Sequence, residues 1–198
     1  MKKIVISWLV CVLGVALIFA WMGNDLLPKD SSSQNSNPLI QAKFTLQGEQ
    51  DKIVRAEELR GKYLLVYFGF THCPDICPTT LLLMSNVIGK LGDASKNIQP
   101  LFISVDPERD TPSATAAYAK NFGKDFMGLS GTPEQIKEAA DSFKVFYSKV
   151  EDANSALGYV VDHSSFIYLM GPDGHYVAHF PSTVSEAELK KELNRYVK

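Results

Sequence analysis

Residues 67–82, YFGFTHCPDICPTTLL, carry two cysteines between two apolar runs. The first run ends at Phe70, and Thr71-His72-Cys73 follows at once. Cys77-Pro78 comes four residues after the first cysteine and opens the second apolar run. This order predicts a strand, a tight loop and a helix, with both thiols where the loop meets the helix.

The region from residue 39 onward continues the alternation of strands and helices. The apolar run 63–70 is typical of a central strand that is covered on both faces. Further strands are expected at 44–46, 53–54, 98–105, 126–129, 145–150, 165–170 and 175–180, and helices at 77–91, 112–122, from 133 and from 185. This order predicts an α/β sandwich with a mixed central sheet, which is the arrangement of a thioredoxin-like domain.

Composition places the chain among globular proteins. It has 198 residues, 45% hydrophobic and 21% charged, which suits one ordinary domain with appendages. The net charge is −2, the pI is about 6.1, and no block of like charge is present. We therefore expect no nucleic-acid partner.

The N-terminus predicts a membrane anchor. Lys2 and Lys3 precede an uncharged run, residues 4–22, close to the ~20 residues that span a bilayer, with Trp8 and Trp21 near its ends. The main alternative to an anchor is a cleaved signal peptide. The apolar run is longer than the apolar core of such a peptide, which has about 7–15 residues. The positive-inside rule puts the remainder outside the cytoplasm. We expect a single-pass inner-membrane protein whose soluble part is periplasmic.

Three segments follow from this pattern. Residues 1–23 are the predicted transmembrane anchor, residues 24–38 a polar, Ser- and Asn-rich flexible linker, and residues 39–198 one thioredoxin-like domain.

The number and spacing of the cysteines favour a functional dithiol over a structural disulfide. The chain has three, too few for a disulfide framework, and Cys11 falls inside the apolar N-terminal run. Cys73 and Cys77 are four residues apart, so a helical turn brings both sulfurs to one face. The free amides and positive dipole end of that turn lower thiol pKa values. The C-x3-C spacing can close a disulfide, and it leaves room for a metal between the sulfurs.

A histidine would complete such a site. Soft thiolates select Cu(I), and imidazole also suits copper. His163 enters the expected strand 165–170, whose start lies opposite the cysteine loop in a thioredoxin-like fold. His72, His175 and His179 are expected to be loop or surface residues. Asp162 either orients the imidazole of His163 or caps a turn, and the sequence leaves both open.

Three motifs carry a resemblance to a known family. FGFTHCPDICP at 68–78, SVDPERDTP at 104–112 and VDHSSFIYLMGPDG at 161–174 together resemble the SCO/SenC family, copper proteins that assist cytochrome c oxidase assembly. The resemblance covers residues 44–197. It implies that Cys73, Cys77 and His163 bind one copper ion per domain, as Cu(I) or Cu(II).

The resemblance also implies partners. It suggests a membrane-anchored copper chaperone that helps to build the CuA centre of an oxidase subunit, rather than an enzyme. Help could come by copper delivery or by keeping the cysteines of that subunit reduced. Besides the CuA-bearing subunit, the candidate partners are another extracytoplasmic copper chaperone and a thioredoxin-like reductant.

Asp106 and Met84 are two further residues that could be considered for the site. The segment from Asp106 to Pro112 is favoured as a strand-to-helix turn with Thr111 as helix cap; the alternative is that Asp106 lines the site near the cysteines. Met84 lies at helical spacing with Val87, so we expect a core residue rather than a thioether ligand.

The main rival function is an extracytoplasmic thiol-disulfide oxidoreductase, which uses the Cys73–Cys77 disulfide. Such enzymes carry C-x2-C and a cis-proline opposite the dithiol, whereas this chain has Asp162-His163-Ser164 there. A thiol peroxidase usually has Ser or Thr three or four residues before its reactive cysteine, and this chain has Pro74 and Cys73 at those positions before Cys77. A structural zinc site would need a fourth ligand. A redox-sensing adaptor protein is a further function with which the sequence is compatible.

Overall fold

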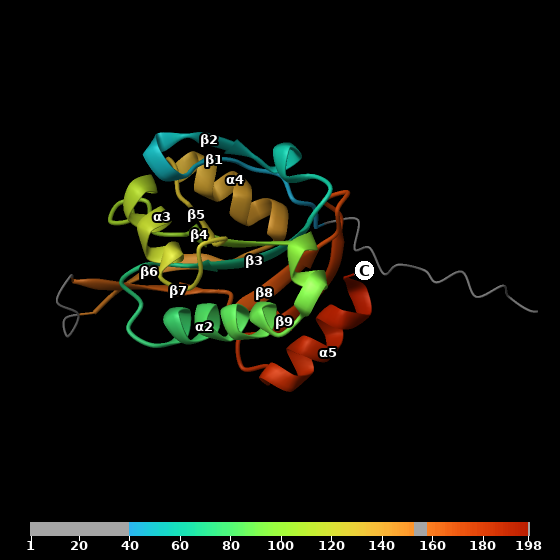
Figure 1. The fold of residues 1–198 in the computed structure, drawn as a ribbon. Coiled ribbons are helices and arrows are strands. Elements are labelled where there is room, and N and C mark those ends of the chain that lie inside the picture. The colour runs from blue at the N-terminus through green and yellow to red at the C-terminus, as the bar shows by residue number, and fades with distance from the viewer. Residues whose placement is uncertain (1–39, 153–157, 198) are drawn as a thin grey trace, which may run out of the picture. The chain divides into compact units, whose positions relative to one another are not determined.

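The computed structural model describes residues 40–152 and 158–197. Its centre is a five-stranded mixed sheet in the order β5-β4-β3-β8-β9 (Figure 1). Strands β3, β4 and β5 are parallel, β8 pairs antiparallel with β3, and β9 pairs antiparallel with β8. The strands are β3 Tyr63–Gly69, β4 Ile98–Ser104, β5 Met127–Leu129, β8 Phe166–Met170 and β9 Tyr176–Pro181. The predicted mixed sheet is confirmed.

Helices cover both faces of this sheet. Helices α2 (Ile76–Gly89) and α5 (Glu186–Tyr196) lie on one face, and α4 (Pro133–Phe143) lies on the other (Figure 1). Helix α3 (Pro112–Lys120) is on the α2 side, because Tyr118 packs on Phe102 of β4 and Ser85 of α2 donates a hydrogen bond to the Phe122 carbonyl. The α/β sandwich is therefore as predicted.

A hairpin and three short 3-10 helices complete the outer parts of the domain. Strands β1 (Thr45–Gln47) and β2 (Ile53–Arg55) pair antiparallel, close to the expected strand positions 44–46 and 53–54. The 3-10 helices are η1 Glu49–Asp51, η2 Ala56–Leu59 and η3 Gly92–Asn97.

Helices α3, α4 and α5 begin where the sequence predicted, because short polar side chains cap their first turns. The hydroxyls of Thr111, Thr132 and Ser185 accept hydrogen bonds from backbone amides in the first turns of α3, α4 and α5. Proline at the first position fixes the start of α3 and α4.

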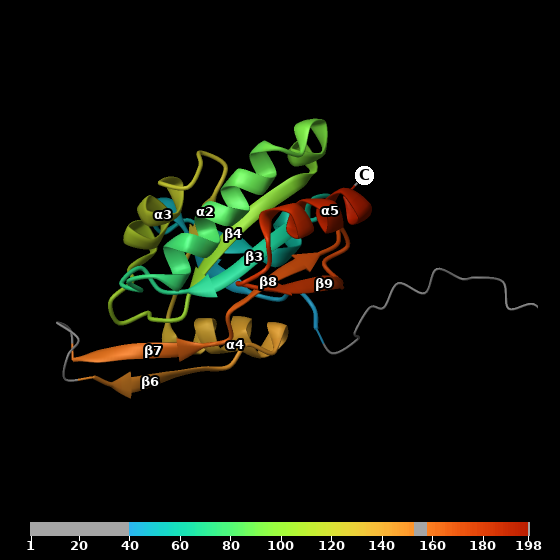
Figure 2. The ribbon, with the colours of Figure 1, turned by 90° about the horizontal axis from the view of Figure 1, so that it is seen from below.

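One strand was missed by the sequence reasoning. We expected residues 160–165 to lead into the strand at 166; instead β7 (Tyr159–His163) pairs antiparallel with β6 (Tyr147–Glu151). The two form a ribbon separate from the central sheet (Figure 2). The run Tyr159-Val160-Val161 favours a strand through its β-branched and aromatic side chains. His163 is therefore the last residue of β7, not the entry to β8.

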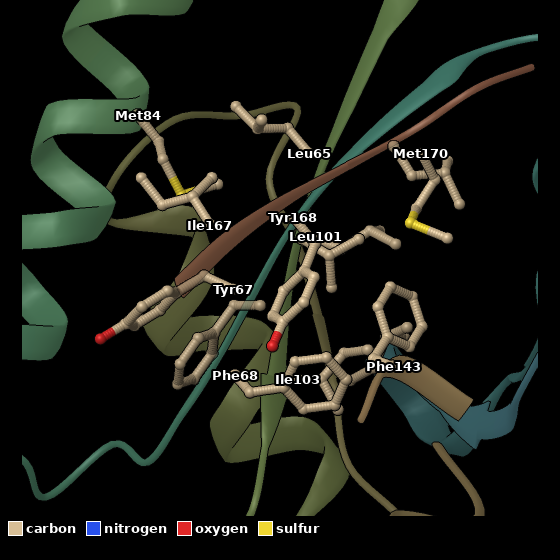
Figure 3. Packing of buried hydrophobic residues seen from close by; sticks show 14 of the residues in the cluster. Leu65, Tyr67, Phe68, Met84, Leu101, Ile103, Phe143, Ile167, Tyr168 and Met170 are labelled. Atoms are coloured by element: carbon tan, nitrogen blue, oxygen red, sulfur yellow. The ribbon is translucent and has the colours of Figure 1, made fainter. Parts of the chain in front are cut away.

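The core fills the space between sheet and helices. Strand β3 is buried from Leu64 to Gly69, as a central strand should be. Figure 3 shows side chains of β3, β4 and β8 together with Met84 of α2 and Phe143 of α4. Met84 is fully buried, so its assignment to the core is confirmed.

The predicted anchor (residues 1–23), linker (residues 24–38) and Cys11 lie outside the described residues. Within residues 40–152 and 158–197, no helix is both long enough and apolar enough to cross a bilayer.

Candidate metal centre

The two cysteines lie where the strand β3 gives way to helix α2. Cys73 is partly exposed in the loop, and Cys77 is fully buried in the first turn of the helix. Both thiols are free. The backbone N–H of Cys77 points at the Cys73 sulfur, 3.4 Å away. The predicted juxtaposition of the sulfurs at a helix start is confirmed.

His163 reaches this pair from 86 residues further along the chain. Its Nε2 is 3.6 Å from the Cys77 sulfur. The ring meets Tyr67 and Phe70 edge-on, with centroids 6.0 and 6.1 Å apart. On its other side Nδ1 is 3.3 Å from the Ser164 carbonyl oxygen. A proton on Nδ1 satisfies that oxygen and leaves the Nε2 lone pair aimed at the cysteines.

The two thiols have unequal affinity for a proton. The Cys77 thiol donates a hydrogen bond to the Cys73 sulfur, and this lowers the pKa of Cys73 to about 5. The same hydrogen bond, followed by burial, raises the pKa of Cys77. Burial lowers the pKa of His163. At neutral pH the site therefore holds one thiolate, one thiol and a neutral imidazole.

Glycine at position 69 makes room for the buried sulfur. A Cβ atom there would lie 2.8 Å from the Cys77 sulfur and 3.2 Å from the Tyr67 ring. The Tyr67 hydroxyl is buried and has no hydrogen-bond partner within the described residues. Burial raises the pKa of that hydroxyl. Neither residue stood out in the sequence, because a glycine and a tyrosine in an apolar strand look like ordinary core.

A buried carboxylate, which the sequence reasoning missed, holds the cysteine loop. Asp110 is fully buried and accepts hydrogen bonds from the Thr71 backbone N–H (2.8 Å), the Thr71 hydroxyl (2.5 Å) and the Ser104 hydroxyl (2.6 Å). Thr71 stands two residues before Cys73, so this carboxylate sets where the loop leaves the sheet. Asp110 is the second aspartate of the 106–112 segment, and nothing in that segment indicated that Asp110 rather than Asp106 would contact the cysteine loop.

The two aspartates proposed around the site differ in position. Asp106 is fully buried and is hydrogen-bonded to Arg109 and to the Tyr159 hydroxyl (2.9 Å), whereas Asp162 is exposed on β7. Neighbouring residues of a strand point to opposite faces, so the Asp162 side chain points away from the His163 ring. Ser164, not Asp162, provides the oxygen near Nδ1.

The turn reading of the 106–112 segment is confirmed. The amide of Asp110 donates to the Asp106 carbonyl, and Thr111 caps α3. Asp106 nevertheless lies within the network around the site, through Arg109.

The other three histidines are loop or surface residues, as expected. His72, His175 and His179 are exposed. His72 is directed to Asp110, with Nδ1 3.5 Å from the carboxylate, and His179 pairs with the Tyr176 hydroxyl at 2.6 Å.

The three donors suit a soft metal ion. Metal–sulfur and metal–nitrogen bonds of about 2.3 and 2.0 Å, at angles of about 110–120°, separate the two donor atoms by about 3.5–3.7 Å. The observed separation between the Cys77 sulfur and His163 Nε2 is 3.6 Å. Among the residues that the structure describes, no three His, Cys, Asp or Glu side chains already form a finished ion site. Closing three donors around an ion thus requires at least one of these side chains to move.

Comparisons with known proteins agree with this picture. The family model SCO1/SenC matches residues 32–198. The chain is 37% identical over 195 residues to the SCO2-like protein RT0576 of Rickettsia typhi, covering 98% of this chain and 96% of the relative.

Solved structures match as well. The copper-bound crystal structure of Arabidopsis thaliana ScoI superposes with a TM-score of 0.75 at 40% identity, over 80% of this chain and 98% of that one. BsSco, described as a member of the Sco family of cytochrome c oxidase assembly proteins with a disulfide switch, has a TM-score of 0.61 at 28% identity, over 80% and 94%. The predicted thioredoxin-like fold is confirmed by these matches.

Proposed function

Because this chain belongs to the SCO1/SenC family, we propose that it binds one copper ion through Cys73, Cys77 and His163 and helps to assemble the CuA centre of a cytochrome c oxidase. The observation that carries the proposal is the 3.6 Å separation between the Cys77 sulfur and His163 Nε2, beside the Cys73 sulfur that lies 3.4 Å from the Cys77 amide. Copper is the bound ion in the similar structure of Arabidopsis ScoI.

The donor set explains why copper fits in both oxidation states. Two thiolates favour Cu(I), and an imidazole nitrogen also serves Cu(II). Cys73 already carries the negative charge that a metal needs, whereas Cys77 keeps its proton. Binding an ion between both sulfurs therefore releases the Cys77 proton, so copper uptake depends on pH.

We favour a metallochaperone over a reductase, and the ion is then cargo rather than a catalyst. The alternative is a thiol-disulfide reductase that keeps the cysteines of the CuA site reduced. The partly exposed Cys73 thiolate beside the buried Cys77 thiol favours this second role. Cys73 would attack a target disulfide and release one target thiolate. Cys77 would then lose its proton, attack the Cys73 sulfur and release the second, leaving a Cys73–Cys77 disulfide.

The proposed place of action follows from the N-terminal sequence. Residues 1–23 would anchor the chain in the inner membrane, residues 24–38 would act as a tether, and the domain 39–198 would work on the periplasmic side. A copper donor and a thioredoxin-like reductant in that compartment would load and reduce the site.

Copper titration of the full-length chain in detergent tests the ligand set. Cu(I) is added in competition with a chelator, and Cu(II) is added directly, to the unchanged chain and to Cys73→Ser, Cys77→Ser and His163→Ala. We expect one copper per chain, lost in both cysteine variants and held much more weakly in His163→Ala. His175→Ala is the matched control, because His175 is exposed and the metal should not need it. Tight binding that survives His163→Ala would remove that ligand from the proposal.

A second experiment separates the two roles. The copper-loaded chain is mixed with a copper-free oxidase fragment that contains the CuA site with its cysteines reduced, and the copper-free reduced chain is mixed with the same fragment in its disulfide form. The chaperone role predicts CuA absorption in the first mixture. Thiols appearing on the oxidase fragment in the second mixture, with a Cys73–Cys77 disulfide forming in this chain and no copper transfer in the first mixture, would establish the reductase role instead. Oxidation to the Cys73–Cys77 disulfide should release copper, because copper needs both thiols.

A further inference from the structure

The strand that carries His163 is not held by the central sheet. Strand β7 pairs with β6 in a ribbon of its own. Alternate residues of a strand share one face, so Tyr159, Val161 and His163 point the same way. His163 meets Cys77, Val161 is buried, and Tyr159 lies against Arg109. This face of β7 therefore rests on the loops that follow β3 and β4.

Arg109 joins the loop after β3 to the ribbon. Its guanidinium carbon is 3.8 Å from the centre of the Tyr159 ring and 5.7 Å from the centre of the Phe70 ring. Nη1 donates a hydrogen bond to the Tyr159 carbonyl at 3.3 Å. Phe70 in turn meets the His163 ring edge-on. The arginine thus touches both the segment that leads into the cysteines and the strand that ends in the histidine.

Asp106 completes this arrangement. Its carboxylate is fully buried, forms an ion pair with Arg109 Nε, and accepts a hydrogen bond from the Tyr159 hydroxyl at 2.9 Å. A buried carboxylate left without its donors is strongly disfavoured, so Asp106 holds Arg109 and Tyr159 in one geometry.

Asp110, four residues after Asp106, holds the loop that carries the cysteines rather than the strand that carries His163. Its hydrogen bonds go to Thr71 and Ser104, not to the ribbon. One turn between β4 and α3 thus carries two carboxylates with different partners, although the Ser104 hydroxyl links the two residues by accepting from the Asp106 amide and donating to the Asp110 carboxylate. Asp110 holds the cysteine loop, and Asp106 with Arg109 holds the histidine strand.

We propose that Asp106, Arg109 and Tyr159 form a positioning clamp that keeps the histidine strand over the cysteine pair, and that opening this clamp withdraws the imidazole while the thiols stay in place. The inference rests on the proposed copper site and concerns how that site lets its ion go. Loss of one of three donors leaves copper on two sulfurs, where a partner's cysteines can compete for it. The clamp thereby controls release without touching the dithiol.

Tyr159→Phe is the sharpest test, because it keeps the ring over Arg109 and removes only the hydroxyl that donates to Asp106. Hydrogen exchange of the β7 amides is measured on the metal-free full-length chain in detergent. Removing one hydrogen bond to a buried charged group should raise exchange there about 10- to 100-fold, with β3 and β4 unchanged. A chelator should remove Cu(II) faster by a similar factor, while the reduction potential of the Cys73–Cys77 pair stays the same.

Three variants complete the design. Arg109→Lys keeps the charge beside Asp106 and loses the planar stack, so it should act in the same direction. Tyr176→Phe also removes one tyrosine hydrogen bond, to His179, and should change none of the readouts. Asp110→Asn should shift the dithiol potential and leave β7 exchange as it was.

The outcomes separate the clamp from the copper site. Unchanged β7 exchange in both Tyr159→Phe and Arg109→Lys would overturn the clamp. So would an equal rise across the whole sheet, which is the signature of general destabilisation. Exchange needs no metal, so failure of the unchanged chain to bind copper would count against the proposed function and leave the test of the clamp intact.

Discussion

Alkylation of Cys73 at different pH values tests the electrostatics of the cysteine pair. The hydrogen bond from Cys77 lowers the pKa of Cys73 from an ordinary 9.0 to about 5. The fold thus favours the charged form, and Cys73 stays a thiolate until the pH falls through about 5. An ordinary cysteine is protonated through most of that range.

The size of the effect follows from these two values. Between pH 6 and pH 8, a thiol with a pKa of 9.0 gains about 90-fold in ionised fraction, and its alkylation rate rises in proportion. With a pKa of about 5, the ionised fraction changes only from about 90% to nearly complete. A thiolate of low pKa is also the weaker nucleophile, with a Brønsted slope of about 0.4–0.5. Cys73 should therefore react faster than an ordinary thiol at pH 6 and more slowly at pH 8.

The assay is iodoacetamide labelling of the reduced, metal-free full-length chain, with peptide mapping to separate Cys73 from Cys11 and Cys77. We expect a rate for Cys73 that changes less than about twofold from pH 6 to pH 8. The buried Cys77 should stay unlabelled. Cys77→Ala removes the hydrogen bond that is the main cause and should restore a steep pH dependence. A rise of about 90-fold in the unchanged chain would refute the reasoning.

Three substitutions test the packing that supports the site. Gly69→Ala puts a carbon 2.8 Å from the Cys77 sulfur, and we expect it to lower the free energy of unfolding by about 1–3 kcal/mol. An unchanged urea midpoint would contradict the close contact. Asp110→Ala removes the acceptor for two Thr71 hydrogen bonds and should cost about 1–3 kcal/mol, measured by thermal denaturation; a stability equal to that of the unchanged chain would argue against the loop anchor. Met84→Ala leaves a cavity beneath α2 and should cost about 2–5 kcal/mol in denaturant; a loss below 1 kcal/mol would remove Met84 from the core.

Local pattern explains which elements the sequence predicted well. Strands β3, β8 and β9 and helix α2 were recognised because apolar runs act over a few neighbouring residues. Strand β7 was missed for the opposite reason. Its partner β6 precedes it across a connection, and its pairing in a separate ribbon depends on contacts that periodicity does not encode.

The sequence by itself determined that two thiols lie close together where a strand gives way to a helix, because only three residues separate them and an apolar run stands on each side. It also singled out His163, as a histidine expected opposite the cysteines. The tertiary structure alone decided how that histidine is held, and that Asp106 and Asp110, four residues apart in one turn, serve different halves of the site. Their partners, Tyr159 and Thr71, are 53 and 39 residues away. Hydrogen bonds over such separations depend on how strands and loops pack, which no short stretch of sequence specifies.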